Sequence, residues 1–141
     1  MDAVSSGEAL PEWRVTVDAG AMKPVALLLR DPNPIHWDVQ VVQRLGLGDR
    51  PINQGPVNLA YVINNLIAWT GDAGSIRQLS VRFLENALAG DVVVAGGTVT
   101  AVHHDDSGTS QIAECEVWLD REDGTRLLQG SAAVRVKGTD Q

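Results

Sequence analysis

The sequence predicts a single α+β domain, in which a five-stranded antiparallel sheet wraps around one central helix. Three observations support this prediction. The chain has 141 residues, 44% of them hydrophobic, which suits one domain with its own core. One long apolar segment in the middle of the chain has the pattern of a buried helix, and four strand-like segments follow it. Hairpin turn signals separate these segments. An up-and-down sheet with the helix packed elsewhere is the alternative geometry.

The chain begins with a short strand and a short helix. Apolar and polar residues alternate over 13–17, which indicates a strand. Asp18 can cap a helix over 21–29, because its carboxylate can accept from the free N–H groups of the first turn. We expect Pro24 in that first turn, where the missing N–H is tolerated.

A second short helix and the main helix follow a proline-rich loop. Asp38 can cap a helix over 39–45. The main helix is expected over 55–69, with Pro56 in its first turn. Its apolar residues surround most of the cylinder, which is typical of a buried helix.

Four long antiparallel strands are expected after the main helix. Turn residues at 105–108 and 122–124 are typical of hairpins and separate the last three strands. The expected strands cover 75–84, 92–103, 111–119 and 126–136.

Composition restricts the partners and the compartment. The net charge of −7 argues against nucleic acid and anionic membranes, which require a basic surface. No apolar run approaches the roughly 18 residues of a membrane helix. Cys115 is the single cysteine, which excludes an internal disulfide and fits the reducing cytoplasm. Residues 1–11 do not have the pattern of a signal peptide, and we expect 1–11 and 138–141 to be loose tails on a domain of 12–137.

The segment 31–36, Asp-Pro-Asn-Pro-Ile-His, is the first candidate site. Asp31 and Asn33 each precede a proline, which biases them away from helical conformations and makes a stiff loop. The loop presents a carboxylate and the His36 imidazole together, which suits general acid–base chemistry. Downstream, Gly55 opens the main helix with an N–H that can stabilise developing negative charge. Such a combination suits the addition of water to an activated double bond.

These segments resemble the signature of MaoC-like (R)-specific enoyl-CoA hydratases. The resemblance is carried by residues 31–38 (Asp-Pro-Asn-Pro-Ile-His-Trp-Asp) and 48–55 (Gly-Asp-Arg-Pro-Ile-Asn-Gln-Gly), and by an Arg-Phe strand with a Gly-Asp turn within 81–92. It implies a hot dog fold and a hydro-lyase acting on thioesters of CoA or of an acyl carrier protein. We expect no metal and no cofactor. Because one such sheet leaves a strand edge open, we expect a homodimer.

The resemblance also implies roles for individual residues. Asp31 and His36 would hold the water that adds to the β-carbon of the substrate. We expect Asp31 to be the base and His36 to orient the water and deliver a proton at the α-carbon, although the sequence leaves this division open. Asn33, Gln54 and Gly55 are the candidate substrate-binding residues. Gly55 would act through its N–H, and Asn33 would hold the loop against the site or only stabilise its turn.

Two positions depart from the family pattern. The family often has glycine where this chain has Arg30, and usually histidine where it has Gln54. Gln54 can form hydrogen bonds but cannot titrate, whereas Arg30 places bulk and positive charge beside the base. These departures leave a second function open, namely a non-catalytic hot dog subunit of a heteromeric hydratase. A hot dog thioesterase would place its carboxylate on the central helix, and 55–69 contains no Asp or Glu.

Other polar residues are weaker candidates. The run 103–106, His-His-Asp-Asp, looks like a metal cluster, but neighbours on a strand face opposite ways, so we expect a solvated hairpin end. Arg82 either meets CoA phosphates or pairs with a carboxylate. Tyr61, Asn64 and Asn65 lie on the buried main helix, where they need partners, and would line the acyl pocket or a subunit interface.

Overall fold

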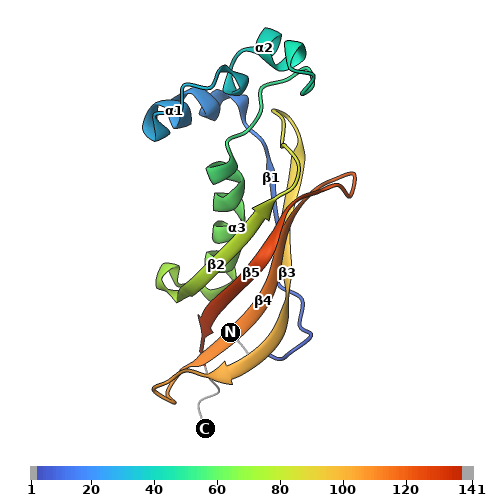
Figure 1. Cartoon of the computed structure of the whole chain (residues 1–141). Helices are drawn as coiled ribbons and strands as arrows, with labels where there is room; N and C mark the ends of the chain where they lie inside the picture. The colour runs from blue at the N-terminus through green and yellow to red at the C-terminus, as the bar shows by residue number, and fades with distance from the viewer. Residues whose placement is uncertain (1–2, 138–141) are drawn as a thin grey trace.

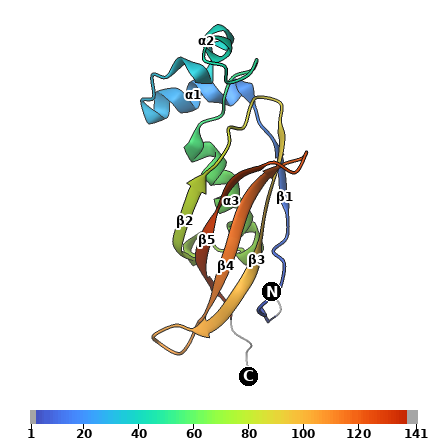
Figure 2. The ribbon, with the colours of Figure 1, turned by 45° about the vertical axis from the view of Figure 1, so that its right-hand side comes forward.

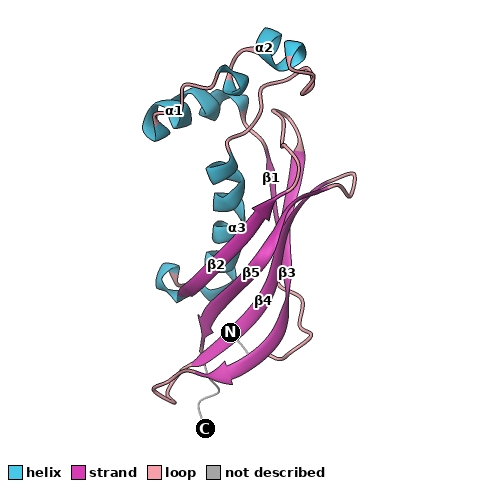
Figure 3. Cartoon of the chain, in the orientation of Figure 1, coloured by secondary structure: helices cyan, strands magenta, loops and turns pink. Residues whose placement is uncertain are grey.

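The computed structural model, which describes residues 3–137, contains one five-stranded antiparallel sheet and one long helix that contacts every strand of it (Figures 1 and 3). The strand order is β1-β3-β4-β5-β2. The predicted α+β class and the sheet around a central helix are confirmed. In chain order, the elements are β1 (Trp13–Thr16), α1 (Ala19–Leu29), the 3-10 helix η1 (Pro34–His36), α2 (Val39–Arg44), α3 (Gly55–Thr70), the 3-10 helix η2 (Ala73–Ser75), β2 (Ile76–Phe83), β3 (Val92–His104), β4 (Gln111–Arg121) and β5 (Arg126–Val136).

The strand β4 shows why alternation in the sequence located the strands. Cys115, Val117 and Leu119 are buried and join the hydrophobic core, whereas Glu116 and Trp118 between them are more exposed. Successive side chains of a strand point to opposite faces of the sheet, so this pattern requires one buried face and one solvated face. Each observed strand lies within two residues of its expected ends, and β5 has the expected bounds.

Helix α3 packs one face into the curved sheet. Val62 and Leu66 are almost fully buried in the core. The expected burial on most faces of the helix is seen on this one face only. Ala60, Ile63 and Ile67 on another face are half-buried. Among residues 3–137, no helix combines the length and the apolar character needed to cross a membrane.

Residues 19–47, which include α1, η1 and α2, form a helical lobe beyond one end of the sheet, next to the first turn of α3 (Figures 1 and 2). The predicted caps are confirmed. A carboxylate oxygen of Asp18 accepts from the Gly20 N–H at 2.8 Å, and Asp38 caps α2 in the same way. Because the Asp18 cap starts α1 at Ala19, two residues earlier than expected, Pro24 lies inside the helix rather than in its first turn.

The segment before β1 differs from the expected loose tail over the residues that the structure describes. The N–H groups of Gly7 and Leu10 donate to carbonyl oxygens of β3 at 2.7 and 2.9 Å, and Ala9 forms an antiparallel bridge with that strand. Val4 and Leu10 are buried in the core. Burial of these two side chains, together with the backbone bonds, holds the segment along the sheet. Residues 1–2 and 138–141 lie outside the described residues.

Candidate active site

The loop after α1 is organised by its own side chains. Just after the end of α1, the Asp31 N–H donates to the Ala26 carbonyl at 2.9 Å. The Asp31 carboxylate then accepts from the Asn33 N–H through Oδ1 at 3.0 Å. The Asn33 carboxamide oxygen accepts from the Ile35 N–H at 3.2 Å and caps η1. This succession of short turns is the stiff loop that the two prolines predicted.

The capping residue of α1, Arg30, adopts a left-handed conformation with φ +53° and ψ +41°. Its N–H donates to the carbonyl oxygens of Ala26 and Leu27, which closes the helix. Glycine adopts this conformation without steric cost, and it is the usual residue at such a helix end. The structure therefore explains why glycine suits this position, and why arginine adds backbone strain there.

The Asp31 and His36 side chains meet, as expected for two groups that one stiff loop presents together. His36 Nε2 lies 3.1 Å from Asp31 Oδ2, and His36 Nδ1 lies 2.6 Å from the Ile52 carbonyl oxygen. A carbonyl oxygen only accepts, so Nδ1 must carry a hydrogen. Nε2 therefore faces the Asp31 carboxylate, and a proton can pass between the two side chains.

The two members of the pair differ in access. The His36 side chain is 7% exposed, whereas that of Asp31 is 36% exposed. His36 therefore lies behind Asp31, oriented from the protein interior by the Ile52 carbonyl. Asp31 is the member that an incoming molecule can reach.

The first turn of α3 begins shortly after Ile52, the residue whose carbonyl contacts His36. Gly55 follows Ile52 by three residues, so their Cα atoms are at most about 10 Å apart. Within residues 3–137, the Gly55 N–H has no backbone or side-chain acceptor. Pro56 occupies the next position and has no N–H to donate. A free N–H at the positive end of a helix of 16 residues is suited to an anionic oxygen.

Gln54, one of the candidate substrate-binding residues, contacts the protein interior. Its side chain is buried and forms no cap bond with α3. Instead, its Nε2 donates to the Met22 carbonyl of α1 at 2.8 Å. Its Oε1 is buried and has no hydrogen-bond partner among the described residues. The observed bond ties α1 to the start of α3.

Asn33 is exposed, and the bond of its carboxamide oxygen stays within the loop. This contact corresponds to the turn-stabilising alternative that the sequence left open. It stabilises the conformation in which Asp31 is presented.

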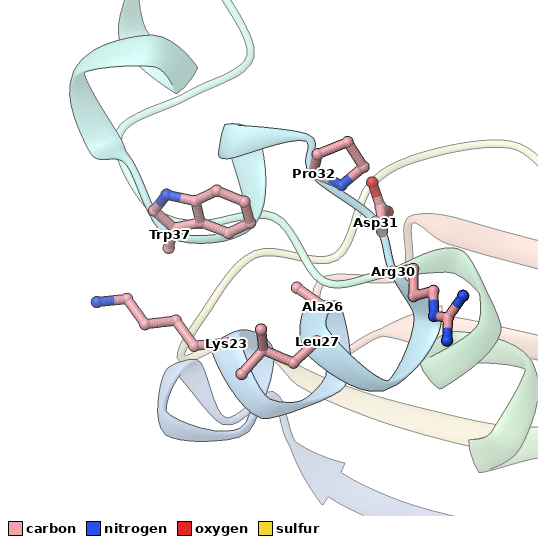
Figure 4. Close-up of a pocket in the computed structure, with 7 residues that line it drawn as sticks. All are labelled: Lys23, Ala26, Leu27, Arg30, Asp31, Pro32 and Trp37. Atoms are coloured by element: carbon pink, nitrogen blue, oxygen red, sulfur yellow. The ribbon is translucent and has the colours of Figure 1, made fainter.

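A cavity of about 560 Å³ opens beside Asp31 between α1 and the loop (Figure 4). Its size lies within the range of roughly 300–1,000 Å³ that is typical of small-molecule sites. In Figure 4 the Trp37 ring stands across the cavity from Leu27. The wall is mainly apolar, with Asp31 as its acidic group. The lining residues are Lys23, Ala26, Leu27, Arg30, Asp31, Pro32 and Trp37.

A buried polar network at the start of α3 was only partly recognised from the sequence. Asn53 Nδ2 donates to Asn58 Oδ1 at 2.8 Å and to the Tyr61 hydroxyl at 3.1 Å. Burial raises the pKa of Tyr61, the Asn53 hydrogen bond opposes that shift, and the Asp18 charge adds to it. The sequence singled out Tyr61 but not the two asparagines. The available signal was Asn58, which lies four residues before Val62 on the buried face of the helix.

The remaining candidates do not join the Asp31 site. His103 pairs with Glu114 at 3.0 Å on the exposed hairpin end, and this hydrogen bond raises the pKa of His103. Among residues 3–137, no three His, Cys, Asp or Glu side chains gather in a way that could hold a metal ion. Arg82 is exposed on β2, and the residue opposite it on β5 is Gln129, not a carboxylate. Burial raises the pKa of the Cys115 thiol to about 11, with a smaller contribution from the Glu114 charge.

Comparison with known families agrees with this fold and loop. The sequence model of the family described as "MaoC like domain" matches residues 6–117. The chain therefore belongs to the MaoC-like family, as its motifs predicted. Among curated proteins, none matches this sequence.

Solved structures of similar fold include three informative ones. An (R)-hydratase from A. caviae involved in PHA biosynthesis has a TM-score of 0.82 at 23% identity, covering 96% of this chain and 99% of that one. A MaoC-like dehydratase from Rhodospirillum rubrum has a TM-score of 0.82 at 21% identity, covering 98% of this chain and 96% of that one. A chain of the ChsH1-ChsH2 complex from Mycobacterium tuberculosis has a TM-score of 0.77 at 21% identity, covering 94% of this chain and 98% of that one. The hot dog fold is thereby confirmed.

Proposed function

We propose that the protein catalyses the reversible hydration of a trans-2-enoyl thioester to the (R)-3-hydroxyacyl thioester. The observation that carries this proposal is the Asp31–His36 pair, with Oδ2 and Nε2 3.1 Å apart and Asp31 lining an apolar cavity. An acid–base pair beside an apolar cavity suits a reaction that moves protons on an acyl chain.

In the hydration direction, Asp31 takes a proton from water while the water oxygen bonds to the β-carbon. The electrons of the double bond move toward the thioester carbonyl, which becomes an enolate. His36 then delivers a proton to the α-carbon and restores the carbonyl. The greater exposure of Asp31 favours it as the group that meets the water, and the bond of His36 Nδ1 to the Ile52 carbonyl favours proton delivery from Nε2.

The Gly55 N–H is the proposed donor to the enolate oxygen. It has no acceptor among residues 3–137 and lies at the positive end of α3. Asn33 and Gln54 act on the site indirectly in this proposal. Their observed bonds, to the Ile35 N–H and the Met22 carbonyl, support roles in holding the loop and the helix start.

The substrate in this proposal is an acyl thioester of CoA or of an acyl carrier protein. The mainly apolar wall beside Asp31 accepts the uncharged parts of such a molecule. The reaction needs no metal and no cofactor, because the carboxylate, the imidazole and the helix N–H supply the required groups. We expect the protein to work in the cytoplasm, where its single buried cysteine stays reduced.

We further propose that the active form is a homodimer. β2 is an edge strand of eight residues, and no other strand of residues 3–137 pairs with its second edge. The apolar face of α3 formed by Ala60, Ile63 and Ile67 is only half-buried by residues 3–137. A second subunit would pair its β2 with this edge and cover both features. Light scattering should therefore give about twice the chain mass of 15.1 kDa, and a monomer at micromolar concentration would contradict the proposal.

The second candidate function is a subunit of a heteromeric hydratase. The similarity in fold to a chain of the ChsH1-ChsH2 complex favours this alternative. The two functions differ in which chain supplies the acid–base pair. If activity appears only when another hot dog chain is added, and Asp31→Asn leaves that activity intact, the alternative is correct.

The decisive experiment follows loss of the enoyl absorbance when crotonyl-CoA and longer enoyl thioesters are hydrated. Asp31→Asn should keep the fold and lose about 10²–10⁴-fold in rate, because the amide cannot accept the proton of water. His36→Ala should behave alike. Asp38→Asn is the matched control, since Asp38 lies in the same segment but caps α2, and asparagine caps helices equally well. Parental turnover by Asp31→Asn would refute the assignment.

A further inference from the structure

The turn before β3 contains a buried carboxylate that the proposed chemistry does not use. The Asp91 side chain is 7% exposed. Its Oδ1 lies 3.1 Å from Nη1 of Arg50, and its Oδ2 lies 3.1 Å from Nε of Arg121. Its Oδ2 also accepts from the Leu88 N–H at 2.9 Å. We refer to Asp91, Arg50 and Arg121 as the Asp91 cluster.

Both arginines of the cluster also bind the backbone of the turn. Arg50 Nη1 donates to the Ala89 carbonyl at 2.7 Å. Arg121 Nη2 donates to the Asn86 carbonyl at 2.9 Å. With the Leu88 N–H held by Asp91, three backbone groups of the turn 86–89 are bonded to charged side chains. Such charge-assisted bonds are stronger than neutral ones and fix the turn.

The fixed turn pairs with the segment that leads into α3. The Ala89 N–H donates to the Pro51 carbonyl at 2.9 Å, and the Asn53 N–H donates to the Ala87 carbonyl at 2.8 Å. Ile52, between them, forms an antiparallel bridge with Leu88. The segment 51–53 is therefore held along one edge by the turn.

The other edge of the same segment faces the loop that carries Asp31 and His36. The Ile52 N–H donates to the Ile35 carbonyl at 2.9 Å, and the Ile52 carbonyl accepts from His36 Nδ1 at 2.6 Å. In extended backbone, successive groups point to opposite sides. One short strand thus connects the Asp91 cluster on one side with His36 on the other.

We propose that the Asp91 cluster is the positioning device of the active site. Arg50 and Asp91 hold the Ile52 carbonyl in the place that orients the His36 ring, and they hold the start of α3 three residues further on. Arg50 is the key member, because it lies two residues before Ile52 and binds both the Asp91 carboxylate and the Ala89 carbonyl. The catalytic part of this inference rests on the proposed hydration.

A purely stabilising role is the competing explanation for the cluster. Buried ion pairs often contribute little net stability, because removing the charges from water offsets their attraction. The position of a catalytic group, by contrast, has a large effect on rate, since displacing it by about 1 Å can lower the rate about 100-fold. An experiment can separate the two explanations, because only positioning alters the environment of His36.

The test compares Arg50→Gln with Arg135→Gln. The two arginines are similar, with side chains 46% and 38% exposed, and each forms an ion pair near 3 Å, but Arg135 pairs with Asp72 far from the site. Arg50→Gln should lower kcat by about 10- to 100-fold with KM unchanged. It should also shift the ¹⁵N signals of His36 Nδ1, which report its hydrogen bond. Arg135→Gln should leave kcat and these signals as in the parent.

A third variant keeps the inference testable if Arg50→Gln does not fold. Arg50→Lys retains the charge but not the guanidinium geometry that reaches both acceptors. It should therefore lower kcat less than Arg50→Gln does, and it should shift the His36 signals by a smaller amount. Folded Arg50 variants with parental kcat and parental His36 signals would overturn the inference. Equal losses in Arg135→Gln would do so as well.

The proposed function and this inference fail in different ways. Absence of hydration by the parent would refute the function, and the His36 signals would still test the positioning. Hydration that survives Arg50→Gln without loss would refute only the positioning.

Discussion

The sheet with α3 and the helical lobe of residues 19–47 are held in different ways. In the first region, packing dominates, and side chains such as Leu66 and Leu128 are fully buried. In the lobe, α1 buries only Met22 and Ala26 fully, whereas Leu27 and Leu28 are 80% and 83% exposed. The lobe nevertheless carries Asp31 and His36. The region with the less complete core is therefore the one that carries the proposed chemistry.

Directed hydrogen bonds compensate for the sparse packing of the lobe. His36 Nδ1 binds the Ile52 carbonyl at 2.6 Å, and Gln54 Nε2 binds the Met22 carbonyl at 2.8 Å. Both contacts reach from the lobe to the segment just before α3. Hydrogen bonds depend on direction as well as distance, so they orient a side chain more sharply than apolar contact does. The comparison indicates that packing stabilises the fold and polar contacts define the site.

The largest expected difference between the regions lies in stability. Leu66→Ala should lower the free energy of unfolding by about 2–5 kcal/mol, because it leaves a cavity in a closed core. Leu28→Ala should change it by less than about 0.5 kcal/mol, since the side chain is exposed in the single chain. Urea titrations of both variants measure the contrast.

The same pair of variants also tests whether the lobe is covered in solution. A loss for Leu28→Ala that approaches that of Leu66→Ala, and that depends on protein concentration, would place Leu28 in a subunit contact. The comparison between the regions would then apply to the single chain only.

The next effect concerns the start of α3, where the two regions meet. Gly55→Pro removes one N–H and should lower hydration by about 100-fold or more, the scale for one lost oxyanion donor. Gln54 already has φ −66° and ψ 141°, the extended conformation that a residue before proline prefers, so the fold should survive. Circular dichroism and thermal melting check the fold, and the enoyl assay checks the rate.

Gly55→Ala is the matched control for that variant. It keeps the N–H, and the added Cβ would meet the Phe83 ring at 3.5 Å, an ordinary contact distance. Its rate should stay near that of the parent. Full activity in folded Gly55→Pro would show that the enolate oxygen is held elsewhere.

The smallest effect should come from the end of α1. Arg30→Gly should raise the free energy of unfolding by about 1 kcal/mol, because glycine adopts the left-handed conformation without strain. Arg44→Gly is the control with the opposite sign. Arg44 ends α2 inside the helix, where glycine costs up to about 1 kcal/mol. If Arg30→Gly is destabilising, the Arg30 side chain forms a stabilising contact that offsets its strain.

The sequence determined most of the fold and the contact between Asp31 and His36, because these depend on local patterns. Alternation every second residue located the strands, with β5 at 126–136 as expected. The carboxylates of Asp18 and Asp38 marked the helix starts, since capping involves residues only two or three apart. The prolines after Asp31 and Asn33 indicated a stiff loop that brings Asp31 and His36 together, five residues apart along the chain.

Only the tertiary structure decided how that pair is held. The His36 ring depends on the Ile52 carbonyl 16 residues away, and the Arg121 side chain reaches Asp91 across 30 residues. The segment before β1 was expected to be loose, yet Val4 and Leu10 enter the core beside a strand some 90 residues further on. Such contacts depend on which surfaces the folded chain brings together. No local period or spacing encodes them, so they emerge only when the sheet has closed around α3.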